Sequence, residues 1–161
     1  QVMVTSVAEL THILLVDMIK NRNGEVINIA SIAGLIPSTA GHTLYGAVKS
    51  WMMHFSEALA AELTSSNIKV IAVCPGFTYS EFHDVTGTRK TVSKLPKFFW
   101  LSAEDVAEES ITAVHKREPG ETSIFIPGRF NKCLALLNRM LPKFVVAKLL
   151  NRYNHVARIS N

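Results

Sequence analysis

The chain has 161 residues, of which 48% are hydrophobic and 19% are charged, which suits a globular protein with a buried core. No apolar run reaches the roughly 20 residues that a membrane-spanning helix needs. The net charge of +4 is unevenly distributed, because residues 122–161 carry seven Lys or Arg and no Asp or Glu, whereas residues 1–121 carry a net −3. Since the basic excess is confined to a tail without a recognisable binding motif, we expect no nucleic-acid partner.

The apolar pattern predicts alternating helices and strands from the start of the chain. Apolar residues at helical spacing predict an amphipathic helix over 2–21, which Asn23-Gly24 should end. The run 26–30 is almost continuously apolar, as in strands that are buried on both faces of a parallel sheet. Residues 32–41 contain two glycines and a proline and are expected to form a loop.

A second helix and strand follow. Helical spacing predicts a long helix over 43–65, and the apolar run 68–74 predicts the next strand, at whose end Pro75-Gly76 turns the chain. A strand, a helix and a second strand in this order indicate a right-handed parallel βαβ unit.

Residues 77–100 are expected to form a loop with one short helix. Six aromatic side chains in this otherwise polar stretch favour a lid over an apolar substrate. A loop that anchors itself to the core explains the same pattern, and the sequence leaves both interpretations open. The six are Phe77, Tyr79, Phe82, Phe98, Phe99 and Trp100.

A third helix and a last short strand complete the pattern. Ser102, followed by Glu104 and Asp105, has the pattern of an N-cap with acidic residues in the first turn, which predicts a helix to about Arg117. The final strand is expected at 123–126.

The residues that can carry chemistry are a hydroxyl, a phenol and an ammonium. Ser31 follows the strand at 26–30, while Tyr45 and Lys49 lie four residues apart on the predicted helix and hence on one face. A phenol with a pKa of about 10 is a poor base at neutral pH. Because an adjacent ammonium favours the phenolate, Lys49 is expected to lower the pKa of Tyr45. Such a pair can pass a proton to or from a carbonyl or an alcohol.

Ser31, the Tyr45-x-x-x-Lys49 pair and Cys74-Pro75-Gly76, in this order and context, resemble the short-chain dehydrogenase/reductase family. The resemblance implies an NAD- or NADP-dependent oxidoreductase that interconverts a carbonyl and a secondary alcohol. With the aromatic stretch, we expect a small substrate with an apolar body. The implied fold is α/β, a partial Rossmann-like, doubly wound parallel sheet of three C-terminal strands with flanking helices.

The resemblance also implies roles for the catalytic residues. Tyr45 would be the general acid in reduction and the general base in oxidation. Lys49 would lower the pKa of that phenol and hydrogen-bond the nicotinamide ribose. Ser31 would donate a hydrogen bond to the substrate carbonyl and stabilise the oxygen as negative charge develops.

Further residues are expected at the cofactor. The backbone of Pro75 and Gly76 would lie against the nicotinamide. Ser80, four residues after Gly76, matches the family's hydroxyl that touches the cofactor, with Thr78 as the second candidate.

The first nucleotide-binding half of the family's fold is not recognisable in this sequence. The chain has eight glycines, and none of them forms the G-x-x-x-G-x-G or G-x-G-x-x-G turn that binds phosphate. Aligned by its motifs, Gln1 falls at the start of the family's fourth helix, so we expect a fragment. The strand at 26–30 would then be a bare apolar edge, which predicts self-association. The helices at 2–21 and 43–65 resemble the family's subunit-interface helices, which also favours a homo-oligomer.

One position departs from the family's pattern. Met3 stands where the family usually has an Asn, which holds a water in the proton relay to the lysine. Because a thioether is a weak acceptor, we predict an impaired relay.

The tail is a separate question. The catalytic portion of the chain is expected at 1–128. After it, helical spacing of apolar residues predicts a basic amphipathic helical tail over 129–161, interrupted at Pro142. Such a helix can lie on an anionic membrane surface. It can also pack its apolar face on the substrate pocket or a partner subunit, which we favour.

The cysteines and histidines predict no metal site. Cys74 and Cys133 have neither C-x-x-C spacing nor a metal-ligand pattern, so a reducing, cytoplasmic compartment is expected, with peripheral membrane association as the alternative. Two other functions stay open. One is a non-catalytic truncated protein that self-associates through an open sheet edge, and the other is a peripheral membrane protein.

Overall fold

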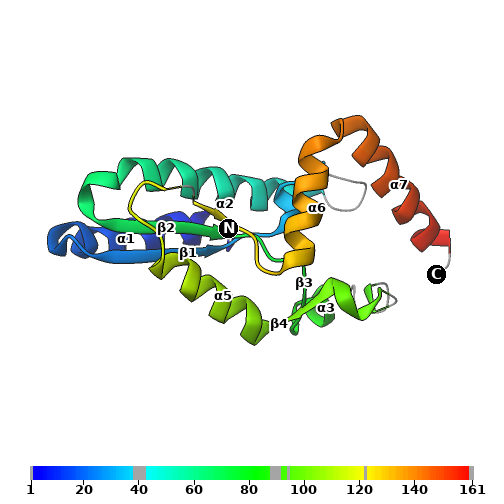
Figure 1. The fold of residues 1–161 in the computed structure, drawn as a ribbon, viewed down its shortest axis with the longest axis horizontal. Helices are drawn as coiled ribbons and strands as arrows, with labels where there is room; N and C mark the ends of the chain where they lie inside the picture. The colour runs from blue at the N-terminus through cyan, green and yellow to red at the C-terminus, as the bar shows by residue number, and fades with distance from the viewer. Residues whose placement is uncertain (1, 38–42, 88–91, 94, 122, 160–161) are drawn as a thin grey trace.

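The computed structural model describes most of the chain (Figure 1). The residues described are 2–37, 43–87, 92–93, 95–121 and 123–159, with side chains up to Arg152. Residues 38–41 of the predicted loop therefore lie outside the described residues.

The core is a three-stranded parallel sheet. Its strands are β1 (Gly24–Ile29), β2 (Ile68–Val73) and β5 (Ile124–Phe125), in the order β1-β2-β5. The central strand β2 is buried along nearly its whole length, which explains why its sequence is almost continuously apolar. The predicted α/β fold with a partial Rossmann-like parallel sheet is confirmed.

Helices cover both faces of this sheet. Helices α1 (Thr5–Asn21) and α2 (Thr43–Glu62) pack on one face, where α2 and β2 form most of the core. Helix α5 (Ala103–His115) covers the other face, where its Val106 and Val114 pack against β2. Its predicted N-cap is confirmed, because the Ser102 hydroxyl accepts a hydrogen bond from the Asp105 N–H at 2.9 Å.

The segment after β2 is more ordered than the predicted loop. Strands β3 (Phe77–Tyr79) and β4 (Trp100–Ser102) form a second, parallel pair, and α3 (Phe82–Val85) lies between them in the chain. The prediction was wrong here because the pairing joins residues more than twenty positions apart. Aromatic contacts hold it together, since the Trp100 ring lies 5.5 Å from that of Phe77 and stacks at 4.8 Å on that of Tyr79.

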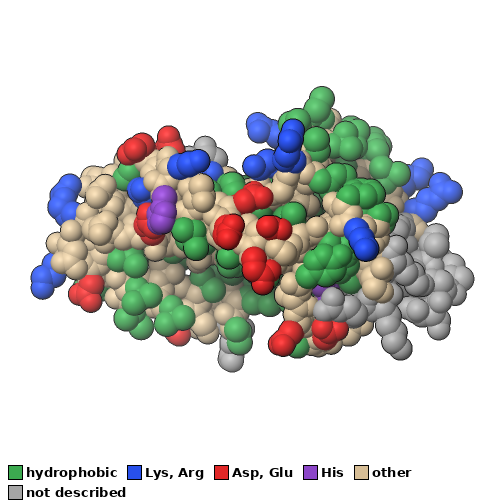
Figure 2. Space-filling view, turned by 60° about the horizontal axis from the view of Figure 1, so that its bottom comes forward, with side chains coloured by type: hydrophobic (Ala, Val, Ile, Leu, Met, Phe, Trp, Pro, Cys, Tyr) green, Lys and Arg blue, Asp and Glu red, His purple; other side chains and the backbone are tan. Residues whose placement is uncertain are grey.

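The tail forms two helices, α6 (Arg129–Met140) and α7 (Lys143–Ile159). They separate at Leu141, which is extended as expected for a residue that precedes a proline. Figure 2 shows hydrophobic side chains gathered at this end of the molecule beside Lys and Arg side chains. Among the described residues, no helix combines the length and the apolar character that crossing a membrane requires. The division of the chain at 128/129 stays a prediction.

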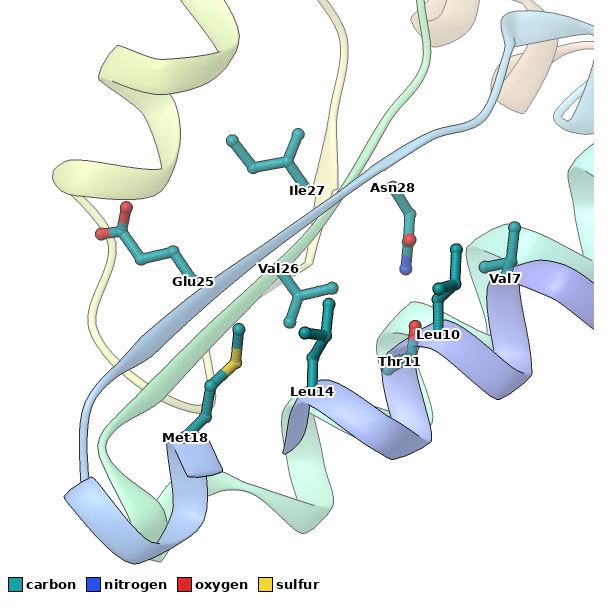
Figure 3. Close-up of a pocket in the computed structure, with 9 residues that line it drawn as sticks. All are labelled: Val7, Leu10, Thr11, Leu14, Met18, Glu25, Val26, Ile27 and Asn28. Atoms are coloured by element: carbon teal, nitrogen blue, oxygen red, sulfur yellow. The ribbon is translucent and has the colours of Figure 1, made fainter. Parts of the chain in front are cut away.

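Helix α1 leaves a groove beside β1 (Figure 3). The groove has a volume of about 290 Å³ and is lined by side chains of both elements. In the described sheet β1 pairs with β2 alone, so its other edge is unpaired among the described residues. The residues that line the groove are Val7, Leu10, Thr11, Leu14, Met18, Glu25, Val26, Ile27 and Asn28.

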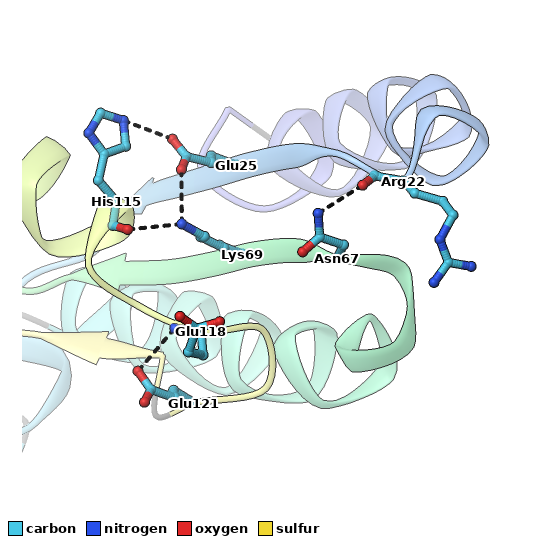
Figure 4. Close-up of polar contacts among 7 residues, drawn as sticks. All are labelled: Arg22, Glu25, Asn67, Lys69, His115, Glu118 and Glu121. Atoms are coloured by element: carbon cyan, nitrogen blue, oxygen red, sulfur yellow. Dashed lines mark hydrogen bonds and ion pairs between the residues drawn. The ribbon is translucent and has the colours of Figure 1, made fainter.

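Polar contacts join the elements at the amino ends of the strands (Figure 4). The Lys69 ammonium donates to the His115 carbonyl at 2.9 Å and lies 3.7 Å from the Glu25 carboxylate. These contacts tie β1, β2 and α5 at the end of the sheet opposite to the one that carries Ser31.

The predicted ends of the elements shift by a few residues for tertiary reasons. Helix α1 is ended by Arg22 in the left-handed region (φ 49°), not by Asn23-Gly24, and Gly24 already belongs to β1. The Asn67 amide donates to the Arg22 carbonyl at 3.0 Å (Figure 4), and the Arg22 guanidinium donates to the Ser65 carbonyl at 2.9 Å. Helix α2, predicted to Ser65, ends at Glu62 and is followed by a 3-10 turn at Thr64–Ser66.

Candidate active site

The site lies where β1 and β2 end side by side. Because parallel strands end at the same edge, the residues that follow them meet there. The Ala30 N–H donates to the Val73 carbonyl at 2.7 Å, and the Ile32 N–H donates to the Pro75 carbonyl at 3.1 Å. Ser31, between these two bonds, is therefore held next to the turn after β2.

A close backbone approach brings Ser31 against helix α2. Ser31 is the N-cap of a 3-10 turn (Ile32–Gly34), and its hydroxyl accepts a hydrogen bond from the Ala33 N–H at 3.1 Å. A Cβ on Gly34 would lie 2.7 Å from the Ser50 nitrogen and 2.8 Å from the Lys49 carbonyl carbon. Only glycine lets this turn pack so close to the helix.

Lys49 reaches from α2 to the end of β1. Its side chain is only 8% exposed, and its ammonium donates to the Ile29 carbonyl at 2.6 Å. Burial lowers the pKa of Lys49 from its ordinary value. The ammonium lies 5.9 Å from the centre of the Tyr45 ring, one helical turn away.

Tyr45 differs from the expectation in one respect. Burial raises the pKa of the Tyr45 phenol above its ordinary value, and a side-chain hydrogen bond with Ser31 acts in the opposite direction. The predicted lowering of the Tyr45 pKa by Lys49 was wrong for this structure, because desolvation of the phenol is the larger effect. The phenol is thus held in its protonated form at neutral pH.

The aromatic segment, residues 77–100, borders the site. The ring of Phe82 lies 5.6 Å from that of Tyr45, and the His83 ring packs edge-on against Phe82 at 5.3 Å and Trp100 at 5.4 Å. The segment is anchored by its own aromatic contacts and at the same time forms an apolar neighbour of Tyr45. That it covers a substrate stays a prediction.

The residues expected at the cofactor follow β2 in order. Pro75 and Gly76 form the turn at the strand end, and the Thr78 hydroxyl donates to the Gly76 carbonyl at 3.2 Å. Ser80 lies after β3, where its hydroxyl accepts a hydrogen bond from the Phe82 N–H at 3.4 Å. The structure therefore gathers Ser31, Lys49 and the turn, while the two hydroxyls lie along the segment that leaves the turn.

Two buried residues adjoin this site. Cys74, which the sequence marks only as part of the Cys74-Pro75-Gly76 motif, lies close enough to Lys49 to be affected by its charge, but burial raises the pKa of its thiol to about 12. Asn131 on α6 is 3% exposed and lies against Gly76. No pattern in the sequence marks Asn131, because its position depends on how α6 returns to the sheet.

Two further expectations concern the rest of the chain. Met3 lies in the turn before α1 and is 38% exposed, and its effect on a proton relay stays a prediction. Among the described residues, no group of His, Cys, Asp or Glu is arranged to hold a metal ion. The cysteines Cys74 and Cys133 are both free.

A comparison of sequences decides the family. The profile of the short chain dehydrogenase family matches residues 1–90, more than half of the chain. This chain belongs to the short-chain dehydrogenase family. The matched region contains Ser31, Tyr45, Lys49 and the turn after β2.

Curated members of the short-chain dehydrogenase family match the first part of the chain. Nodulation protein G of Rhizobium meliloti (strain 1021) is 42% identical over 84 residues, which are 52% of this chain and 34% of that protein. A 3-oxoacyl-[acyl-carrier-protein] reductase of Chlamydia trachomatis is 50% identical over 60 residues, which are 37% of this chain and 24% of that protein. The matched stretches thus span about a third or less of these relatives' lengths.

Solved short-chain dehydrogenase structures share the fold. A 7beta-hydroxysteroid dehydrogenase aligns with a TM-score of 0.73 at 20% identity over 92% of this chain and 55% of its own. A short-chain dehydrogenase from Sphingobium yanoikuyae, solved in complex with NADPH, aligns with a TM-score of 0.68 at 23% identity over 87% of this chain and 54% of its own. At these identities the likeness shows the fold alone.

Proposed function

We propose that this chain carries the catalytic residues of an NAD(P)-dependent oxidoreductase, which interconverts a carbonyl and a secondary alcohol of a substrate with an apolar body. The observation that supports the proposal most directly is that Tyr45 lies close enough to the Ser31 hydroxyl for that group to affect its pKa, with Lys49 buried one turn along the same helix. Membership of the short-chain dehydrogenase family agrees with it.

Tyr45 carries the proton that reduction of a carbonyl requires. Its phenol is protonated at neutral pH and can give this proton to the oxygen of a carbonyl that is being reduced, although the pKa raised by burial makes it a weaker acid than a free tyrosine. The Ser31 hydroxyl, which lies near Tyr45, can donate to the same oxygen and stabilise developing negative charge. In oxidation the proton moves in the opposite direction, from the alcohol to Tyr45.

The residues at the strand ends fit a nicotinamide cofactor. An ammonium has three N–H donors, and the Ile29 carbonyl takes one of those of Lys49, so donors remain for ribose hydroxyls. Backbone at Pro75-Gly76 and the hydroxyls of Thr78 and Ser80 would hold the cofactor, which supplies the hydride. The Sphingobium yanoikuyae relative was solved with NADPH and a serine dehydrogenase with NADP+, so we propose NAD or NADP for this chain.

Turnover of NADH or NADPH with a panel of ketones that carry apolar bodies tests the proposal. Tyr45→Phe, which removes only the phenolic hydroxyl group, should lower kcat by about 10²-fold or more. Tyr79→Phe is the matched control, because Tyr79 lies in the aromatic segment, is 50% exposed, and keeps its ring contact with Trp100 when the hydroxyl is lost. Equal turnover by wild type and Tyr45→Phe would contradict the assignment of Tyr45 as the proton donor.

The non-catalytic alternative rests on the edge of β1. Ile29 on that strand is 51% exposed, and an exposed apolar strand edge can pair with another chain. Fluorescence titration with NADPH separates the two functions, since binding favours the enzyme and concentration-dependent self-association without binding favours the alternative. The exposed apolar side chains of α1 also support a homo-oligomer, which we propose for either case.

The exposed surface of the tail favours a second candidate, docking on an anionic membrane surface. Five large apolar side chains of α6 and α7 are more than half exposed, close to basic side chains and to no acidic residue of the segment (Figure 2). Self-pairing of this surface would bring like charges together, whereas anionic lipid headgroups would neutralise them. The apolar side chains are Leu136, Leu137, Met140, Phe144 and Leu149.

Co-sedimentation with vesicles tests the docking of the tail. Binding to vesicles that contain phosphatidylserine, but not to phosphatidylcholine alone, is expected, and Phe144→Glu should reduce it. Val85→Glu is the control, because Val85 is also highly exposed, at 84% against 74% for Phe144, but lies on α3. Equal pelleting of wild type and Phe144→Glu rejects the tail as the membrane contact and leaves a cytoplasmic protein as the proposal.

A further inference from the structure

Helix α6 touches the loops on which the proposed chemistry depends. It stands across the carboxyl end of the sheet (Figure 1). At its start, the Phe130 ring packs edge-on against Phe98 at 5.2 Å and Phe99 at 4.8 Å, both in the segment between β3 and β4. Near its end, the Asn138 amide donates to the Leu35 carbonyl at 3.0 Å, just after the turn that Ser31 caps.

The contact of α6 with the turn after β2 is the tightest of the three. Asn131 is 3% exposed, and its amide nitrogen donates to the Pro127 carbonyl at 3.0 Å, which fixes the orientation of the side chain. A Cβ on Gly76 would lie 2.9 Å from both Cγ and Nδ2 of Asn131 and would overlap its Oδ1. The side chain of Asn131 therefore fills the space that the missing side chain of Gly76 leaves.

We infer that Asn131 is a positioning residue that fixes the Pro75-Gly76 turn by packing against Gly76. The inference rests on the proposed function, in which this turn lies against the nicotinamide. The turn is also bonded to the loop of Ser31, because the Pro75 carbonyl accepts from the Ile32 N–H. A displacement at Gly76 is thereby passed to the hydroxyl that faces the substrate, and displacements of about 1 Å cost up to about 10²-fold in rate.

Substitutions of Gly76 and Asn131 test this contact, because the substitution of Asn131 should repair the defect that the substitution of Gly76 causes. Gly76→Ala pushes its new methyl into Asn131, so kcat/KM for NADPH should fall by about 10²-fold and the midpoint of urea unfolding should drop. Adding Asn131→Ala removes the overlapping atoms and should recover about tenfold or more of kcat/KM relative to Gly76→Ala alone.

The control substitutes another asparagine of the same helix. Asn138→Ala breaks the bond to Leu35 but leaves the atoms over Gly76 in place, so it should not rescue Gly76→Ala. Rescue by Asn131→Ala and not by Asn138→Ala, in both unfolding midpoint and kcat/KM, supports the inference. Rescue of the unfolding midpoint alone overturns it, because the contact is then structural and does not position the turn for the cofactor.

The test separates the inference from the proposed function. An active wild type whose Gly76→Ala defect is not repaired by Asn131→Ala overturns the inference and leaves the proposed function standing. A wild type that neither binds NADPH or NADH nor turns over a ketone rejects the proposed function, and the positioning role is then overturned with it.

Discussion

Helices α1 and α2 look alike in sequence, yet they differ strongly in how many of their residues are buried. Both are long and amphipathic, with 17 and 20 residues. Helix α2 buries one continuous face, which includes Lys49, Met52, Met53, Ser56, Leu59 and Ala60. Helix α1 buries Thr11 alone among its described residues, and leaves Leu10, Ile13, Leu14, Val16 and Ile19 exposed.

The difference follows from where each helix meets the sheet. Helix α2 lies over the central strand β2, so its apolar face is enclosed on all sides by core side chains. Helix α1 lies at the edge strand β1, and the groove between them stays open (Figure 3). An amphipathic pattern thus predicts a helix with a face to bury but does not say how completely it is buried. Two of the three candidate catalytic residues, Tyr45 and Lys49, are carried by α2, whose apolar face is buried in the core.

A matched pair of leucines should show this contrast most strongly. Leu59 on α2 is 9% exposed, and Leu59→Ala should lower the free energy of unfolding by about 2–4 kcal/mol, because it leaves a cavity in the core. Leu14 on α1 is 55% exposed, and Leu14→Ala should cost about 0.5 kcal/mol. Urea denaturation measures both, and equal costs would show that α1 is covered in solution.

Substitutions of Gly34 and Gly24 compare how tightly α2 and α1 pack against their neighbours. Gly34→Ala places a methyl against the backbone of α2, which cannot yield, and should cost about 1–3 kcal/mol and displace the turn that carries Ser31. Gly24→Ala meets the flexible Met18 side chain of α1 and should cost less. Thermal unfolding of the two variants checks the order, and a larger cost at Gly24 would contradict it.

The environment of Tyr45 on α2 can be read from its titration. Because burial raises its pKa above the ordinary value of 10.0, tyrosinate absorbance that Tyr45→Phe removes should appear above pH 10.0. The stability that this shift contributes is fully present below the unfolded pKa of about 10 and is lost as pH rises through the folded pKa. Ser31→Ala removes the opposing hydrogen bond and should move the transition higher still. A transition at lower pH than in wild type would contradict the assigned contact.

The smallest effect on stability is expected from a charge on α1. Leu10 lines the groove and is 59% exposed, so Leu10→Lys should change the free energy of unfolding by about 0.5 kcal/mol or less while reducing self-association. Leu44, 76% exposed at the start of α2, provides the control Leu44→Lys. Sedimentation velocity measures the self-association of both variants, and an equal change in both would show that the groove is not the self-association interface.

The sequence predicted the elements well where local chemistry decides them. The apolar runs of β1 and β2, the Ser102 cap of α5 and the break at Pro142 all follow from residue type and spacing, and the structure has them. The pairing of β3 with β4 was missed, because it depends on aromatic contacts between Trp100 and rings far away in the sequence. The left-handed Arg22 was missed for a similar reason, since its carbonyl is held by Asn67.

For the candidate site, the sequence by itself determined which groups are present and their order along the chain. The four-residue spacing of Tyr45 and Lys49 places them on one helical face, and Ser31 directly follows a buried strand. Only the tertiary structure decided the pKa of Tyr45, because burial and the partner of the Lys49 ammonium depend on how β1 and α2 pack. It also decided the place of Asn131 over Gly76, because no local rule brings the start of α6 back to the end of β2.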